Sequence, residues 1–118
     1  MRFLALVALL ASQTCAGAAL AETRCGYVVN PTPGNWWITD NKADWIMRTQ
    51  GQDRDPGMDF IPDLTTHDFV KTNGSYGYAC GCVTGAFDAK NHTVVKITGF
   101  ARKPLAACRK DKSLKTPE

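Results

Sequence analysis

The positions of the cysteines restrict the fold of this chain more than any other sequence feature. Cys25, Cys80, Cys82 and Cys108 all follow an N-terminal stretch that resembles a secretory signal peptide. In an exported chain, four cysteines are typical of two disulfides, for which three pairings are possible. In the chain-entropy model each long-range disulfide adds roughly 3.5 to 4 kcal/mol to the free energy of unfolding. We therefore predict a small exported domain that depends on two disulfides.

The first 21 residues carry the three regions of a signal peptide. Arg2 supplies the basic start, residues 3–11 are unbroken apolar sequence, and Ala19-Leu20-Ala21 is a small-x-small cleavage site. The apolar run is too short to cross a bilayer, which takes about 20 residues. We expect a signal peptide over residues 1–21, and a single domain over residues 22–118. That domain should have no membrane anchor and should be located in the periplasm or secreted.

Alternating side chains predict a sheet in both halves of this domain. Residues 25–29, 36–40 and 45–49 indicate a three-stranded meander, and residues 75–84 and 93–100 indicate a hairpin. In the first hairpin strand, Tyr76, Tyr78, Cys80 and Cys82 share one face. The other face carries only small residues, which usually marks close approach by another backbone. In the second hairpin strand, Val95 and Ile97 are predicted to share a face.

One short helix is expected between the meander and the hairpin. Asp63 or Thr65 can cap it, it should run through Val70, and Asn73-Gly74 supplies a left-handed stop. The predicted fold class is therefore α+β: a small twisted antiparallel sheet of about five strands with one short helix and two disulfides.

The Cys80-Gly81-Cys82 sequence allows two interpretations. Residues two apart on a strand lie about 6.6 to 6.8 Å apart, which is at the limit of disulfide geometry. This favours two separate long-range disulfides. Hairpin register favours the pairs Cys25–Cys82 and Cys80–Cys108, although the other pairings stay open. The alternative is a periplasmic thiol–disulfide enzyme that uses Cys80 and Cys82.

No other pattern points to catalysis. His67 and His92 lack neighbours at metal-ligand spacing, and neither a nucleophile elbow nor a carboxylate couple stands out. We expect no metal, no cofactor and no enzymatic activity. Lys and Arg total 14 against 11 Asp and Glu, a net charge of +3 that predicts no nucleic-acid partner. The basic residues near the C-terminus are interpreted as a solvated tail.

Binding to another protein is the hypothesis that remains. Aromatic residues are enriched at binding hot spots, and an acidic loop can steer association with a basic cleft. The sequence thus predicts a protein-binding, inhibitory or immunity module whose partner is a cell-wall hydrolase or a toxin. The candidate binding residues are Trp37, Tyr76 and Tyr78 with the loop acids Asp53, Asp55 and Asp59.

Three segments carry a family resemblance: residues 24–37 (RCGYVVNPTPGNWW), residues 71–82 (KTNGSYGYACGC), and Lys103-Pro104-Leu105 followed by Cys108-Arg109. Together they resemble a family of small exported bacterial proteins known only as a domain of unknown function. The resemblance covers essentially the whole domain. It supports the domain boundaries and the cysteine framework, and it implies no functional site.

Overall fold

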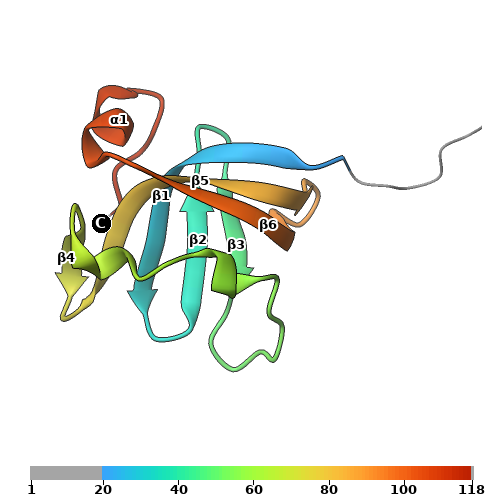
Figure 1. Ribbon diagram of the computed structural model, residues 1–118. Coiled ribbons are helices and arrows are strands. Elements are labelled where there is room, and N and C mark those ends of the chain that lie inside the picture. Colours follow the sequence, from blue (N-terminus) through green and yellow to red (C-terminus); the bar gives the residue numbers. More distant parts are fainter. Residues whose placement is uncertain (1–19, 118) are drawn as a thin grey trace, which may run out of the picture.

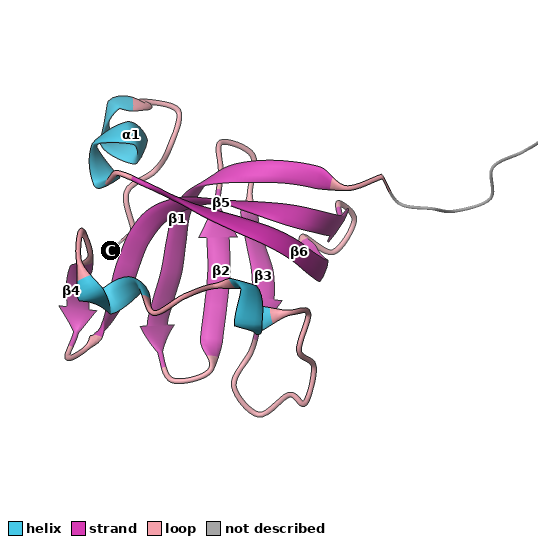
Figure 2. Cartoon of the chain, in the orientation of Figure 1, coloured by secondary structure: helices cyan, strands magenta, loops and turns pink. Residues whose placement is uncertain are grey.

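The computed structural model describes residues 20–117 (Figures 1 and 2). Nearly all of the predicted signal peptide lies outside these residues, and the first strand begins at Glu22. The elements are β1 (Glu22–Thr32), β2 (Asn35–Thr39), β3 (Asp44–Arg48), the 3-10 turns η1 (Met58–Phe60) and η2 (Leu64–Thr66), β4 (Val70–Asn73), β5 (Tyr76–Asp88), β6 (Thr93–Lys103) and α1 (Leu105–Lys110). The meander and the hairpin are confirmed. The sheet has six strands rather than about five, because β4 was not predicted.

The sheet closes on itself. Its strand order is β1-β2-β3-β6-β5-β4, and β1 also pairs with β5, so five strands form a ring and β4 continues from β5. The ring closes between β3 and β6 by a short parallel contact, Ile46 beside Thr93. This is the arrangement of five-stranded Greek-key folds such as the OB-fold. Closure matters because it pairs strand edges that would otherwise invite aggregation.

Two hydrophobic cores lie on opposite faces of β1 and β5. Along β1, Val28 points into the ring, while Tyr27 and Val29 point outwards beneath α1. The inner core consists of Val28, Ile38, Trp45, Met47, Leu64, Ala79, Val83, Val94 and Ile97. The outer core consists of Tyr27, Val29, Tyr78, Cys80, Leu105 and Cys108. Because successive side chains of a strand point to opposite faces, β1 and β5 each contribute residues to both cores.

The small-residue face of β5 is a place of close backbone approach, as predicted. A Cβ atom on Gly77 would lie 1.8 Å from the carbonyl oxygen of Val70 on β4. Gly26 on β1 is equally restricted, since its Cβ would lie 1.8 Å from the carbonyl oxygen of Thr39. Only glycine lets the neighbouring backbones come this near.

The predicted helix before the hairpin is wrong. Asp63 does cap a turn, since it accepts a hydrogen bond from the Thr65 N–H at 3.0 Å, but that turn is the three-residue η2. The chain then extends, and Val70 pairs with Tyr78 as part of β4. Gly74 forms part of the β4–β5 turn instead of a helix stop. Pairing with β5 therefore overrides the local helix signals.

The predicted face of β6 is also wrong. Val95 is 55% exposed, whereas Val94 and Ile97 are buried. The register with β5 shifts between Ala86 and Phe87, so Val95 has no partner and the alternation is interrupted there. Such a bulge turns the following residues to the other face, which sequence alternation cannot anticipate.

Candidate functional site

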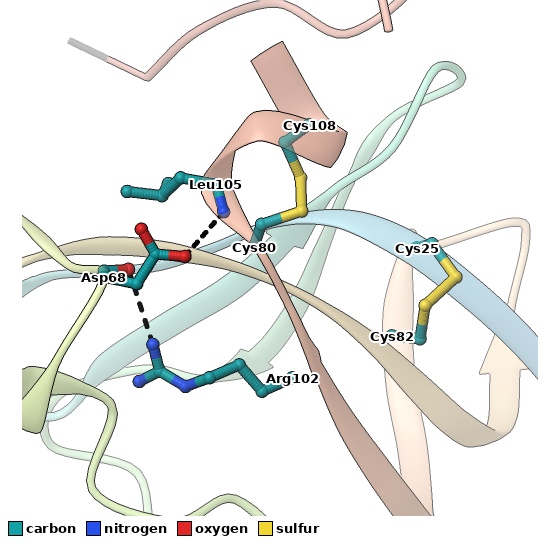
Figure 3. The surroundings of a disulfide bond; sticks show 7 residues. All are labelled: Cys25, Asp68, Cys80, Cys82, Arg102, Leu105 and Cys108. Carbon is teal, nitrogen blue, oxygen red and sulfur yellow. Dashed lines mark hydrogen bonds between the residues drawn. A yellow bond between two sulfur atoms is a disulfide. The ribbon is translucent and has the colours of Figure 1, made fainter. Parts of the chain in front are cut away.

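Two disulfides bind the N- and C-terminal parts of the domain to β5 (Figure 3). Cys25 bonds Cys82 and Cys80 bonds Cys108, which confirms the favoured pairing. Cys80, Cys82 and Cys108 are buried, while Cys25 is exposed. Cys80 and Cys82 are thus held in separate bridges. Disulfides of this kind are typical of a non-cytoplasmic environment.

The short helix α1 is fixed to the sheet by Cys80–Cys108 and by hydrogen bonds from a distant loop. Asp68 Oδ2 accepts a hydrogen bond from the Leu105 N–H at 2.8 Å, and Arg102 of β6 donates to the backbone carbonyl oxygen of Asp68 at 3.4 Å (Figure 3). Arg102 also donates to the carbonyl oxygen of His67 at 2.6 Å. Helix α1 was not among the predicted elements. Its available signals were Pro104 before the first turn and Arg109-Lys110 in the last.

The candidate aromatic residues do not form one surface. Tyr78 is only 7% exposed and packs edge-on against Tyr27, with ring centroids 5.3 Å apart. It belongs to the outer core and is not available on the surface. Trp37 is half-buried against the same core, and Tyr76 is half-buried at the start of β5.

The candidate acids lie on the loop that follows β3 and ends with the η1 turn, and their side chains have different roles. Asp53 and Asp59 are exposed, and neither makes a hydrogen bond with the described residues. Asp55 is also exposed, but its carboxylate accepts hydrogen bonds from the N–H groups of Met58 and Gly57, both at 2.9 Å. These bonds lower the pKa of Asp55. Asp55 therefore shapes the loop, and Asp53 and Asp59 carry its free negative charge.

Arg54 anchors this loop to β3 and β6, where the two strands meet. Its guanidinium donates hydrogen bonds to the carbonyl oxygens of Met47 and Val94, both at 2.6 Å. The loop also pairs with β6 through the Ile97 N–H and the carbonyl oxygen of Pro56, at 2.7 Å. Sequence reasoning missed Arg54 because its partners are brought to it only by ring closure.

Phe60 is presented by this anchored loop. Its side chain is 53% exposed, although it is large and apolar. Its neighbour Asp59 is exposed as well. No sequence motif marks Phe60, and only the structure places it outwards.

A pocket of about 300 Å³ lies between the ring and the segment that joins β3 to β4. In Figure 1 this segment runs back across β1, β2 and β3. Trp36 and Phe69 supply aromatic walls, and Asn30, Arg48 and Asp63 supply polar groups. Arg48 is half-buried, and its guanidinium makes no hydrogen bond or ion pair with any residue in 20–117. We call this hollow the Arg48 pocket; no sequence motif marked it.

The other end of β2 holds a charged cluster with a structural role. Arg24 pairs with Asp40 at 3.0 Å and with Glu22 at 2.8 Å, and its guanidinium lies 3.9 Å from the ring centroid of Trp45. Burial raises the pKa of Asp40, but hydrogen bonds, led by that from the Lys42 N–H, outweigh burial and hold the pKa below its ordinary value. The cluster ties β1 to the β2–β3 turn.

No other chemical centre is evident in the described part of the chain. Across residues 20–117, no group of three His, Cys, Asp or Glu side chains is placed to hold a metal ion. No helix within those same residues has the length and hydropathy needed to span a membrane. The sites with distinct chemistry are the disulfide framework, the anchored loop and the Arg48 pocket.

The fold and its sites define a small disulfide-bonded domain with a closed sheet and an anchored acidic loop. The chain belongs to the family described as a protein of unknown function (DUF4087), whose model matches residues 19–115. This match confirms the family resemblance seen in the sequence. No curated protein and no solved structure matches the chain.

Proposed function

We propose that this protein is an exported, non-catalytic binding module that inhibits or neutralises a partner protein in the periplasm or outside the cell. The observation that carries the proposal is the outward presentation of Phe60 on a loop anchored by Arg54. Exposed aromatic residues are frequent hot spots in protein interfaces. A loop already held in one conformation loses less entropy on binding.

The charge beside Phe60 supports a partner with a basic cleft. Asp53 and Asp59 are exposed on the same loop, and their carboxylates are not used by hydrogen bonds within the described residues. Acidic groups around an apolar anchor accelerate association with a basic surface and set its specificity. A cell-wall hydrolase or a toxin with a basic active-site cleft is the partner class that we propose.

The test measures both binding and inhibition. Purified protein is used to capture partners from periplasmic extract, and it is added to a basic muramidase while the clearing rate of a cell-wall suspension is recorded. Phe60→Ala and the pair Asp53→Asn/Asp59→Asn should each weaken capture and inhibition. Val95→Ala is the matched control, because Val95 is also an exposed apolar residue but lies on β6.

Two results would count against this function. The first is that the protein captures no partner and leaves the activity of the hydrolases unaffected. The other is a partner that binds the Phe60→Ala and Asp53→Asn/Asp59→Asn variants as tightly as the unaltered protein. The second result would move the interface away from the anchored loop.

A further inference from the structure

We propose that the Arg48 pocket binds an apolar α-amino acid, either free or as the C-terminal residue of a peptide, through its carboxylate. Phe60 is not among the residues that line the pocket, and the proposal does not rest on the proposed inhibitory function. It follows from three properties of the pocket: an unpaired cation, fixed hydrogen-bond acceptors and a residue-sized apolar space.

The unpaired cation is Arg48. It lies at the end of β3, directly opposite Trp36 of β2 in the sheet register. It is half-buried and forms no hydrogen bond or ion pair with any residue in 20–117, although its charge contributes to lowering the pKa of Asp55. Arg54 shows the contrast, since its guanidinium donates hydrogen bonds to the carbonyl oxygens of Val94 and Met47. A guanidinium fork matches the geometry of a carboxylate and binds it through two parallel hydrogen bonds.

The fixed acceptors are on Asn30 and Asp63. Asn30 Nδ2 donates hydrogen bonds to the carbonyl oxygens of Thr32 and Asn35, at 2.9 and 2.8 Å, which leaves Oδ1 as an oriented acceptor. Asp63 Oδ1 accepts hydrogen bonds from the hydroxyl and the N–H of Thr65, and Asp63 Oδ2 has no hydrogen-bond partner in the described chain. A ligand that satisfies these oxygens must donate N–H groups as well as offer a carboxylate to Arg48.

The apolar space sets the size of the ligand. At about 300 Å³ the pocket is at the lower end of the range for small-molecule sites, which is roughly 300 to 1,000 Å³. Trp36 and Phe69 form part of its wall, and Leu64 of the inner core also lines it. One apolar or aromatic side chain fits, and a longer chain must leave through the open side. A carboxylate, an N–H donor and one apolar side chain together describe an amino acid or the end of a peptide.

Calorimetry and NMR titration with defined probes test this assignment. Phenylalanine and leucine should bind, and phenylalanine amide, which lacks the carboxylate, should bind about tenfold more weakly or worse. Arg48→Met should cause a similar loss, with Arg48→Lys intermediate because an ammonium lacks the planar fork. Arg109→Met is the matched control, since Arg109 lies on α1 away from the pocket.

The same titrations distinguish the two sources of the ligand. A tripeptide that ends in phenylalanine should bind more tightly than the free amino acid if the pocket captures peptide ends, and more weakly if it captures free amino acids. Chemical shift changes should be confined to the pocket, and quenching of tryptophan fluorescence by ligand should be lost in Trp36→Phe.

The proposal is overturned if the acid and its amide bind equally well, or if neither binds at millimolar concentration to a protein whose folding is confirmed by NMR. It is also overturned if an uncharged sugar such as N-acetylglucosamine shifts the pocket resonances while the amino acids do not. None of these results bears on whether Phe60 binds a partner protein.

Discussion

The guanidinium of Arg54 donates a hydrogen bond at 2.6 Å to the carbonyl oxygen of Val94, which lies 40 residues further along the chain. With its second bond to Met47, also at 2.6 Å, this side chain links β3 to β6 beside their short parallel contact. One residue thus completes the closed sheet and anchors the loop that presents Phe60.

Replacement of Arg54 by Met should therefore loosen both the ring and the loop. Removal of the guanidinium leaves carbonyl groups on two strands without donors, at about 1 to 3 kcal/mol for each unsatisfied buried group. We expect a total loss of roughly 2 to 4 kcal/mol in urea unfolding, together with faster amide exchange in residues 50–60. Arg109→Met is the control, and an unchanged midpoint for Arg54→Met would contradict the anchoring role.

The disulfides should contribute unequally to stability. The bond Cys25–Cys82 spans 57 residues and Cys80–Cys108 spans 28, which the chain-entropy model converts to roughly 4 and 3.5 kcal/mol. Double Ser variants of each pair, compared by urea unfolding, should both be destabilised, and only the loss of Cys80–Cys108 should release α1.

The oxidation state of the same cysteines distinguishes two functional hypotheses, a binding module and a thiol–disulfide enzyme. Because all four sulfurs are bonded, alkylation of the native protein should label none of the four, and reduction should expose all of them. Thiol exchange catalysis requires an accessible thiolate of low pKa. Mass spectrometry that finds Cys80 or Cys82 labelled before reduction would favour the enzyme.

Asp68 should be sensitive to substitution for two separable reasons. Its carboxylate caps α1 at the Leu105 N–H, and its backbone has a positive φ of 48°. Asp68→Ala loses the cap and tolerates this backbone poorly, so we expect a loss of about 1 to 2 kcal/mol. Asp68→Asn keeps an acceptor and a residue suited to positive φ, and it should lose less. A lower melting temperature for Asp68→Asn than for Asp68→Ala would refute the capping role.

Two glycines should respond to alanine in opposite ways. In Gly26→Ala the new Cβ meets the Thr39 carbonyl oxygen at 1.8 Å, and only movement of the backbone can relieve the clash. We expect a loss of several kcal/mol, about 3 or more. In Gly99→Ala the nearest atom lies 3.7 Å away, so the variant should match the parent or gain up to about 1 kcal/mol. Equal melting temperatures for the two variants would argue against close approach at Gly26.

Stability should fall on acidification, and Asp40 should account for part of that fall. Burial raises the pKa of this carboxyl. Hydrogen bonds from the Lys42 N–H and other donors lower the pKa by more than burial raises it, so the folded-state pKa lies below 3.8. A lowered pKa contributes stability above the unfolded value, and this contribution disappears as the pH drops through the folded value. Relative to the unaltered protein, Asp40→Asn should flatten the dependence of the unfolding free energy on pH below about 4. If Asp40→Asn and the unaltered protein showed equal slopes of unfolding free energy against pH, Asp40 would not contribute to the acid sensitivity.

The sequence alone determined the meander and the hairpin, because these depend on local alternation, turn residues and short-range register. It favoured the observed disulfide pairing but left the other pairings open. It also determined that Tyr78 and Cys80 share a face, although not that this face is buried beneath α1. The helix predicted through Val70 failed because the local capping signal of Asp63 lost to pairing with β5.

Only the tertiary structure decided the two candidate sites. Arg54 and Arg48 are both arginines near the end of the meander, and nothing in the sequence distinguishes them. Closure of the ring brings the carbonyl groups of β3 and β6 to Arg54, whereas Arg48 lines a pocket and forms no hydrogen bond or ion pair within residues 20–117. Contacts across long sequence separations determine which charge is satisfied and which is left free for a ligand, and no local pattern encodes those contacts.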